Sequence, residues 1–150
     1  MDRKTENEKK KEYLREYNYH VRRIRRIETE LAELRTMKIS GFGNIDGMPH
    51  GSRQSDLSDY AAELDSLERK LVEEWHRRVL AYKEIVRRIK GLKSENEKDV
   101  LFYRYIAGDD WPEIAQKLRY SERQVHRYHG KALEHFELPE EKGKDCTICQ

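Results

Sequence analysis

Basic side chains recur at every fourth position near the end of this 150-residue sequence. They are Arg119, Arg123, Arg127 and Lys131. On an α-helix this spacing aligns them along one face, and Gln124 lies beside them. In the major groove of DNA, arginine pairs bidentately with guanine and glutamine with adenine, while other cations hold phosphates. The stripe therefore predicts a helix that reads duplex DNA.

Gly130 lies on the same predicted face, although glycine costs helix stability relative to alanine. Its lack of a side chain suits close approach of a nucleic-acid backbone. A solvated charged face on a small helical domain is the plainer interpretation of such a stripe, but the surrounding helix caps and crossing pattern favour the DNA-reading helix. The predicted DNA-contacting residues are Arg119, Ser121, Arg123, Gln124, His126, Arg127, Gly130 and Lys131.

Signals for the starts of three helices surround the stripe. Asp110 is a predicted N-cap with Pro112 in the first turn, where its missing N–H costs nothing. Two further pairs have the spacing of capping boxes: Ser94 with Glu97, and Ser121 with Gln124. Gly108 is placed to end the first of these helices as a C-cap.

Apolar residues between these signals suit short helices that cross steeply. The first helix, 94–107, offers Val100, Leu101, Tyr103, Tyr105 and Ile106 for packing, with Trp111 covering the corner. The second offers Ile114, Ala115 and Leu118, and the third Val125, Tyr128, Ala132, Leu133 and Phe136. The turn Arg119-Tyr120-Ser121 lacks the usual glycine, so either the turn is wider or Arg119 adopts a left-handed backbone. Residues 94–138 therefore predict a helix-turn-helix domain.

Two long apolar series precede this domain. Leu14, Tyr17, Val21, Ile24, Ile27, Leu31 and Leu34 predict a helix over about 2–37. Leu57, Tyr60, Leu64, Leu67, Leu71, Trp75, Tyr82, Ile85, Ile89 and Leu92 predict a second over about 56–92. The Gly-rich segment 39–55 between them reads as a loop, either a binding loop or a plain connector.

The two long helices fit an antiparallel coiled-coil hairpin over residues 1–93. Folding at the loop brings the run of Arg22, Arg23, Arg25 and Arg26 opposite Glu68, Glu73 and Glu74. The same seam fits a homodimer through the long helices, and the sequence does not separate the two. The basic end of the second helix fits either a phosphate contact or a solvated face.

Composition agrees with an all-α protein of this kind. Charged residues make up 40% and hydrophobic residues 36% of the chain, which suits long helices with narrow apolar seams. No long apolar run is present, so we expect a cytoplasmic protein without a membrane segment. Residues 139–150 read as a polar tail. Its Cys146 and Cys149 are either half of a zinc site, completed by His126, His129, His135 or a second chain, or simply reduced thiols of the tail, which we prefer. No catalytic motif stands out, so we expect neither an enzyme nor a cofactor.

Segment Trp111–Leu118 followed by Ser121–Tyr128 resembles the helix-turn-helix in the fourth region of bacterial sigma factors. The whole arrangement is similar to the sigma-like regulators of phages and prophages of Gram-positive bacteria, the RinA/ArpU type. That similarity extends to Gly47-Met-Pro-His-Gly51, Ser55-Asp-Leu-Ser-Asp-Tyr60 and Tyr128-His-Gly-Lys-Ala-Leu133. No segment corresponds to the part of a full sigma factor that melts the promoter. The resemblance implies that Arg123, Gln124 and Arg127 face bases, and that Arg119, Ser121 and Lys131 face phosphates.

These observations lead to one expected function and two alternatives. The expected function is sequence-specific DNA binding by a phage transcription regulator that acts with host RNA polymerase at late-gene promoters. A DNA-packaging protein of the small-terminase type also joins a helix-turn-helix to oligomerising helices. A coiled-coil module that binds only protein is the third possibility. The sequence leaves open the operator, the sign of regulation and the oligomeric state.

Overall fold

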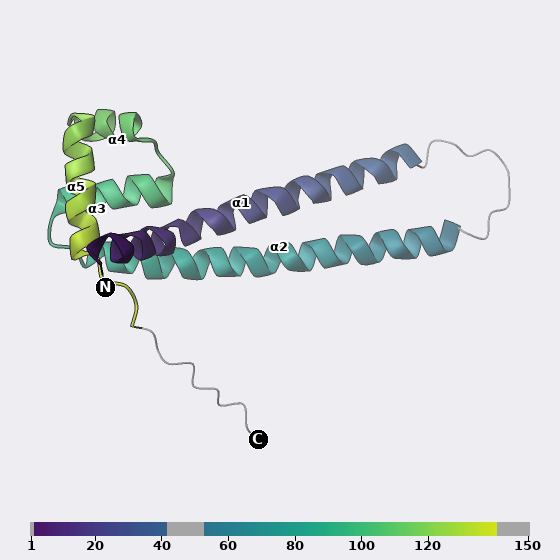
Figure 1. Ribbon diagram of the computed structural model, residues 1–150. Helices are drawn as coiled ribbons and strands as arrows, with labels where there is room; N and C mark the ends of the chain where they lie inside the picture. The colour runs from purple at the N-terminus through teal and green to yellow at the C-terminus, as the bar shows by residue number, and fades with distance from the viewer. Residues whose placement is uncertain (1, 42–52, 141–150) are drawn as a thin grey trace, which may run out of the picture. The chain divides into compact units, whose positions relative to one another are not determined.

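A computed structural model describes residues 2–41 and 53–140. The elements in chain order are α1 (Arg3–Gly41), α2 (Arg53–Lys90), α3 (Glu95–Leu101), the π-helical segment η1 (Phe102–Ala107), α4 (Trp111–Leu118) and α5 (Glu122–His135) (Figure 1). All regular structure in the described residues is helical, which confirms the all-α prediction. Most of the Gly-rich loop predicted at 39–55 and the tail after residue 140 lie outside the described residues. No helix among the described residues combines the length and apolar character needed to cross a bilayer.

Contacts between residues divide the chain into two compact units. One comprises Tyr17–Lys83 and is called the hairpin unit below; the other combines Met1–Glu16 with Glu84–Gln150 and is called the C-terminal unit. The long helices α1 and α2 each contribute to both units, whereas the sequence placed a boundary at residue 93. The first turns of α1 thus belong to the unit that contains α3, α4 and α5.

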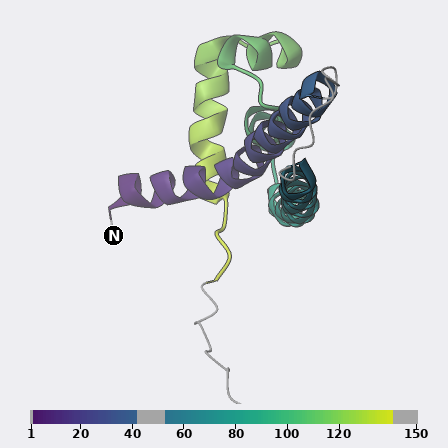
Figure 2. The ribbon, with the colours of Figure 1, turned by 90° about the vertical axis from the view of Figure 1, so that its right-hand side faces the viewer.

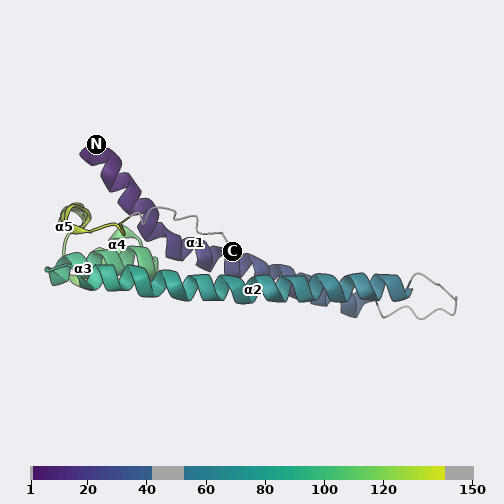
Figure 3. The ribbon, with the colours of Figure 1, turned by 90° about the horizontal axis from the view of Figure 1, so that it is seen from below.

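The hairpin unit pairs α1 with α2 in opposite directions, as Figures 1 and 3 show. Its apolar seam contains Ile27, Leu31 and Leu67, flanked by Leu34, Leu64 and Leu71. Nearer the Tyr17 end of the hairpin unit, Arg23 Nε lies 3.1 Å from Glu74 Oε1, an ion pair without hydrogen-bond geometry. Of the arginines and glutamates expected to lie opposite each other, Arg23 and Glu74 form an ion pair, whereas Glu68 pairs with Arg35 instead.

The sequence wrongly assigned part of the α2 seam. Trp75 and Tyr82 were predicted to face α1, but they are 47% and 40% exposed. Glu74 (2% exposed) and Ala81 (8%) occupy the buried positions instead. Glu74 is held there by His20, whose Nδ1 lies 2.9 Å from Oε2, so a polar contact sets the rotation of α2 at this level.

The C-terminal unit has its core where α3, α4 and α5 meet. Val100, Ile114, Ala115 and Val125 form that core, with Tyr103, Trp111, Leu118 and Tyr128 packed against it. Figure 2 shows α4 and α5 meeting at a steep angle. The start of α1 joins the same unit through Lys10, which donates a hydrogen bond of 3.0 Å to the Leu133 carbonyl, and through Tyr13, whose ring lies 6.0 Å from that of Phe136.

The first helix of this unit departs from the prediction in two ways. Ser94 makes no capping hydrogen bond through its side chain, and Glu97 does not close a capping box. Glu97 is buried instead, with Oε2 2.9 Å from Nδ1 of His135. This tertiary contact holds the carboxylate away from the backbone N–H that a capping box would use. The second half of the helix is π-helical (η1), and Gly108 ends it with φ 79°, the left-handed cap that was predicted.

Candidate nucleic-acid interface

The start of α4 is a complete capping box. The Asp110 side chain accepts a hydrogen bond of 2.9 Å from the Glu113 N–H, and Glu113 Oε2 accepts one of 3.0 Å from the Asp110 N–H. Pro112 lies in the first turn, where no N–H is required. Local chemistry alone therefore defines where α4 begins.

The turn between α4 and α5 contains a strained backbone position. Arg119 has φ 59° and ψ 39°, which is the left-handed conformation considered as an alternative to a wider turn. The Tyr120 N–H donates to the Ala115 carbonyl at 3.1 Å and closes the turn tightly. Ser121 then caps α5, since its Oγ accepts a hydrogen bond of 3.2 Å from the Gln124 N–H.

The buried face of α5 matches the predicted apolar spacing with one addition. Val125, Ala132, Leu133 and Phe136 are buried and Tyr128 is half-buried. The sequence missed His129, which is 9% exposed and lies 2.9 Å through Nε2 from the Tyr105 hydroxyl. Its position four residues after Val125 was the available signal.

Burial changes the acid–base chemistry of this His–Tyr pair. Burial lowers the pKa of His129 to about 4 and raises the pKa of Tyr105 to about 12. Both side chains are therefore neutral at pH 7. The Trp111 ring centroid lies 4.9 Å from that of His129 and completes an aromatic wall behind α5. This face of α5 packs into the core of the C-terminal unit, so the opposite face points to solvent.

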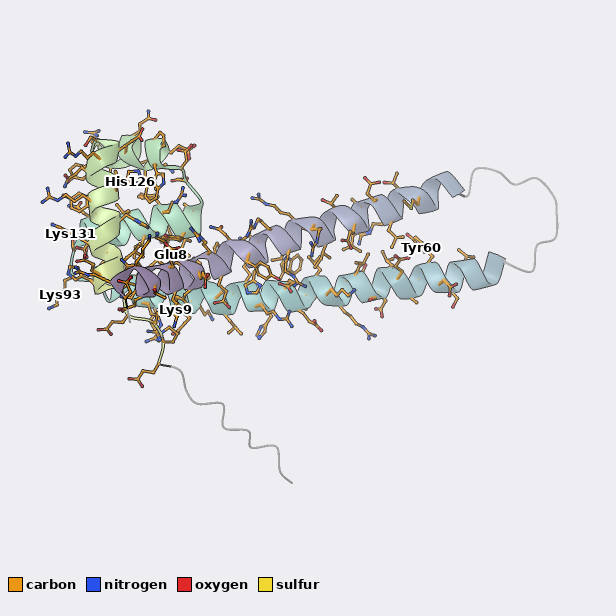
Figure 4. The ribbon with its side chains drawn as sticks, viewed as in Figure 1. Glu8, Lys9, Tyr60, Lys93, His126 and Lys131 are labelled. Carbon is orange, nitrogen blue, oxygen red and sulfur yellow. The ribbon has the colours of Figure 1, made fainter. Side chains whose placement is uncertain are left out.

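The outward face of α5 and its preceding turn carries the predicted DNA-contacting residues. Seven of the eight are exposed, and Gln124 is half-buried. The exposed ones are Arg119, Ser121, Arg123, His126, Arg127, Gly130 and Lys131. Figure 4 labels His126 and Lys131 on this helix. The His126 ring lies 4.3 Å from the Trp111 ring, centroid to centroid, so packing holds this side chain at the edge of the face.

Carboxylates neutralise some cations of the C-terminal unit but not those of this face. Elsewhere Arg87 and Arg88 both bind Glu84, and Lys117 binds Asp109. By contrast, Arg119, Arg123, Arg127 and Lys131 form no ion pair with any carboxylate that the structure describes. Lys93, labelled in Figure 4, is likewise exposed and unpaired within the described chain. The face thus presents positive charge that the described residues do not neutralise.

Gly130 lies within this face, at an open position of α5. A Cβ atom built there would meet no heavy atom within 4 Å. Packing against the described residues therefore does not require glycine at this position.

No metal site emerges from the part of the chain that the structure describes. No group of three or more His, Cys, Asp or Glu side chains there is placed to hold a metal ion. Cys146 and Cys149 lie outside the described residues, so this finding does not concern them.

The chain matches no family model, no curated protein and no solved structure. The geometry and charges of α4 and α5 carry the functional argument.

Proposed function

We propose that this protein is a sequence-specific DNA-binding transcription regulator in which α4 and α5 act as a helix-turn-helix. In this proposal α5 is the recognition helix and lies in the major groove. The supporting observation is the set of four exposed cations, Arg119, Arg123, Arg127 and Lys131, that no carboxylate of the described chain neutralises. A duplex supplies phosphates and guanine edges that such side chains bind.

The architecture of α4 and α5 agrees with this assignment. Steep crossing of two short helices around Ile114, Ala115 and Val125 leaves the outer face of α5 free. The tight turn at Arg119 places that cation beside the N-terminus of α5, where backbone N–H groups also favour phosphate. We assign base contacts to Arg123, Gln124 and Arg127, and phosphate contacts to Arg119, Ser121 and Lys131.

The remaining parts of the proposal come from the sequence. Resemblance to sigma-like phage and prophage regulators suggests action with host RNA polymerase at late-gene promoters, in the cytoplasm. The long helices α1 and α2 then act as an antiparallel coiled-coil hairpin that contacts other proteins. Homodimerisation through these helices stays a prediction.

The deciding experiment is selection of bound duplexes from a fragmented pool of phage and host DNA. We expect a short recurring motif upstream of genes, lost in the Arg123→Ala/Arg127→Ala double variant. The matched control is Arg22→Ala/Arg26→Ala, which removes the same charge from exposed positions on α1. Absence of any enrichment at low salt would refute DNA binding. Enrichment of one site by a ring-shaped oligomer would instead indicate a packaging protein.

A further inference from the structure

An exposed apolar stripe runs along α2 in the hairpin unit. It consists of Val72 (61% exposed), Trp75 (47%), Val79 (48%) and Tyr82 (40%). Their spacing of three and four residues aligns them along one face over about three helical turns. Large exposed apolar residues gathered in this way mark interaction sites, whereas single ones need no explanation.

The stripe borders a shallow groove between α2 and α1. Tyr17, Trp75, Arg78, Val79 and Tyr82 line this groove, which has a volume of about 340 Å³. The Tyr17 and Tyr82 rings pack with centroids 5.8 Å apart, which gives the groove a firm aromatic floor. All five lining residues belong to the hairpin unit, so the groove is complete within one compact body.

Arg78 gives the groove a fixed positive charge. Its Nε and one terminal nitrogen donate to the Tyr17 hydroxyl at 3.2 and 3.0 Å, and its guanidinium carbon lies 5.5 Å from the Tyr17 ring centroid. The side chain is half-buried, yet no carboxylate in the described residues pairs with it. A guanidinium carries five N–H donors, so several stay available to an acceptor from outside.

Two further basic residues border the stripe on its outer side. His76 and Lys83 directly follow Trp75 and Tyr82, and both are exposed. Neither forms an ion pair with another described residue. Glu74, which precedes Trp75, is buried against His20, whereas Glu73 is exposed beside Val72 at the other end of the stripe. Near Trp75, Val79 and Tyr82, the groove therefore combines an apolar stripe with the unneutralised positive charges of Arg78 and Lys83.

We propose that this groove binds an acidic amphipathic helix of another protein. Apolar side chains of that helix, spaced three and four residues apart, pack against Trp75, Val79 and Tyr82. A carboxylate on its flank pairs with Arg78, and others face His76 and Lys83. This surface lies on α2 rather than α5, so the inference stands independently of DNA binding.

A second copy of the chain is a poor occupant of the same groove. Antiparallel pairing of two α2 helices centred on the stripe places the Arg78 of each copy close to the Arg78 of the other. Like charges at the centre of an interface oppose association. Charge complementarity thus favours a partner that brings acidic residues.

Two synthetic amphipathic helical peptides test this proposal. They share leucines at the a and d positions over about three heptads, and they carry glutamate in one peptide and lysine in the other at the flanking positions. Binding of each labelled peptide to the full chain is measured by fluorescence anisotropy. We expect the glutamate peptide to bind at least roughly tenfold more tightly than the lysine peptide.

The neighbouring positions Val79 and Leu80 on α2 allow a glutamate to be placed inside and outside the groove. Val79→Glu and Arg78→Gln should each weaken binding of the glutamate peptide by roughly tenfold. Leu80→Glu introduces the same charge at a position that is 53% exposed but outside the groove, so it should leave binding unchanged. Circular dichroism verifies that the helical content of each variant equals that of the wild type.

Three outcomes would overturn the proposal. One is failure of the full chain to bind either peptide. Another is equal affinity for the two peptides, which would show that charge plays no part. The third is self-association by sedimentation equilibrium that Val79→Glu abolishes and Leu80→Glu does not, which would make a second copy the occupant. DNA affinity of the Val79→Glu variant, measured in parallel, reports on the DNA-binding proposal separately.

Discussion

The Tyr105 hydroxyl and the His129 Nε2 atom lie 2.9 Å apart and join η1 to the buried face of α5. Both groups are buried, and the ring centroids are 5.9 Å apart in a stacked arrangement. This contact sets the rotation of α5 about its axis, because a buried polar side chain needs its partner. The basic residues on the opposite face therefore depend on it for their outward direction.

Stability should fall in mild acid because of His129. Burial lowers its pKa from the ordinary 6.5 to about 4, so below pH 6.5 the unfolded chain binds a proton that the folded chain does not. The contribution of neutral His129 to the free energy of unfolding is fully present above pH 6.5 and is lost as the pH falls toward 4. At pH 5 the loss is roughly 2 kcal/mol. Urea denaturation at pH 7 and pH 5 measures this loss, which the His129→Phe variant should lack. An equal loss in that variant would assign the effect to other groups.

Lys10 should stabilise the C-terminal unit, whereas its neighbour Lys9 should not. Lys10 is 5% exposed and its Nζ donates to the Leu133 carbonyl near the end of α5. Lys10→Met leaves that carbonyl without this donor, so we expect a loss of about 1–3 kcal/mol in the free energy of unfolding. Lys9, labelled in Figure 4, is exposed, and Lys9→Met is the control. Equal denaturation midpoints for the two variants would contradict the structural role.

Arg119→Gly should separate stability from DNA binding. A glycine accepts φ 59° without the penalty that a side chain carries there, so thermal denaturation should show a gain of about 0.5–1 kcal/mol. Loss of the cation should weaken binding to all duplexes by a similar factor, because a phosphate contact is blind to sequence. Weakening confined to one site would instead identify Arg119 as a base contact.

Gly130→Ala tests how closely the nucleic-acid backbone approaches α5. The position is open within the chain, and alanine favours a helix over glycine by about 1 kcal/mol. We expect a higher melting temperature together with weaker DNA binding. A more stable variant that binds DNA as tightly as the wild type would show that no backbone approaches Gly130.

Arg127 and Lys131 should respond differently to substitution. Arg127→Ala should cost roughly 1–3 kcal/mol of binding to the selected site and relax the preference at one base pair. Lys131→Ala should weaken binding to all sequences and reduce the salt slope by about 1. Binding titrations at several salt concentrations, on specific and unrelated duplexes, measure both effects. A uniform loss for Arg127→Ala would mark it as a phosphate contact.

Elements whose signals are local were predictable. Asp110 and Glu113 satisfy each other's backbone donors, so the start of α4 needs no distant partner. Ser121 also caps α5 through a local contact, although Gln124 does not return the second hydrogen bond of the predicted capping box. The eight candidate residues lie on α5 and its turn, and seven are exposed, because helical spacing decides which side chains share a face. Their role in DNA binding stays a prediction.

Contacts between distant segments were not predictable. Glu97 has the spacing of a capping partner but binds His135, thirty-eight residues away. Trp75 and Tyr82 follow the apolar spacing of a seam but lie at the surface, since the contact between His20 and Glu74 rotates α2. Apolar spacing predicts the buried face of a helix only to within about one residue around the helix. Which residues at the margin of that face are covered depends on how the neighbouring helix packs.

The sequence by itself determined that the chain is helical, where the short helices begin, and which residues form the basic face of α5. These properties arise from backbone donors, turn conformations and helical periodicity, all of which act within a few residues. Only the tertiary structure decided that His129 is buried against Tyr105, that the start of α1 joins the C-terminal unit, and that the stripe from Val72 to Tyr82 stays uncovered. Those outcomes depend on which side chains, far apart in the sequence, pack together or form hydrogen bonds and ion pairs.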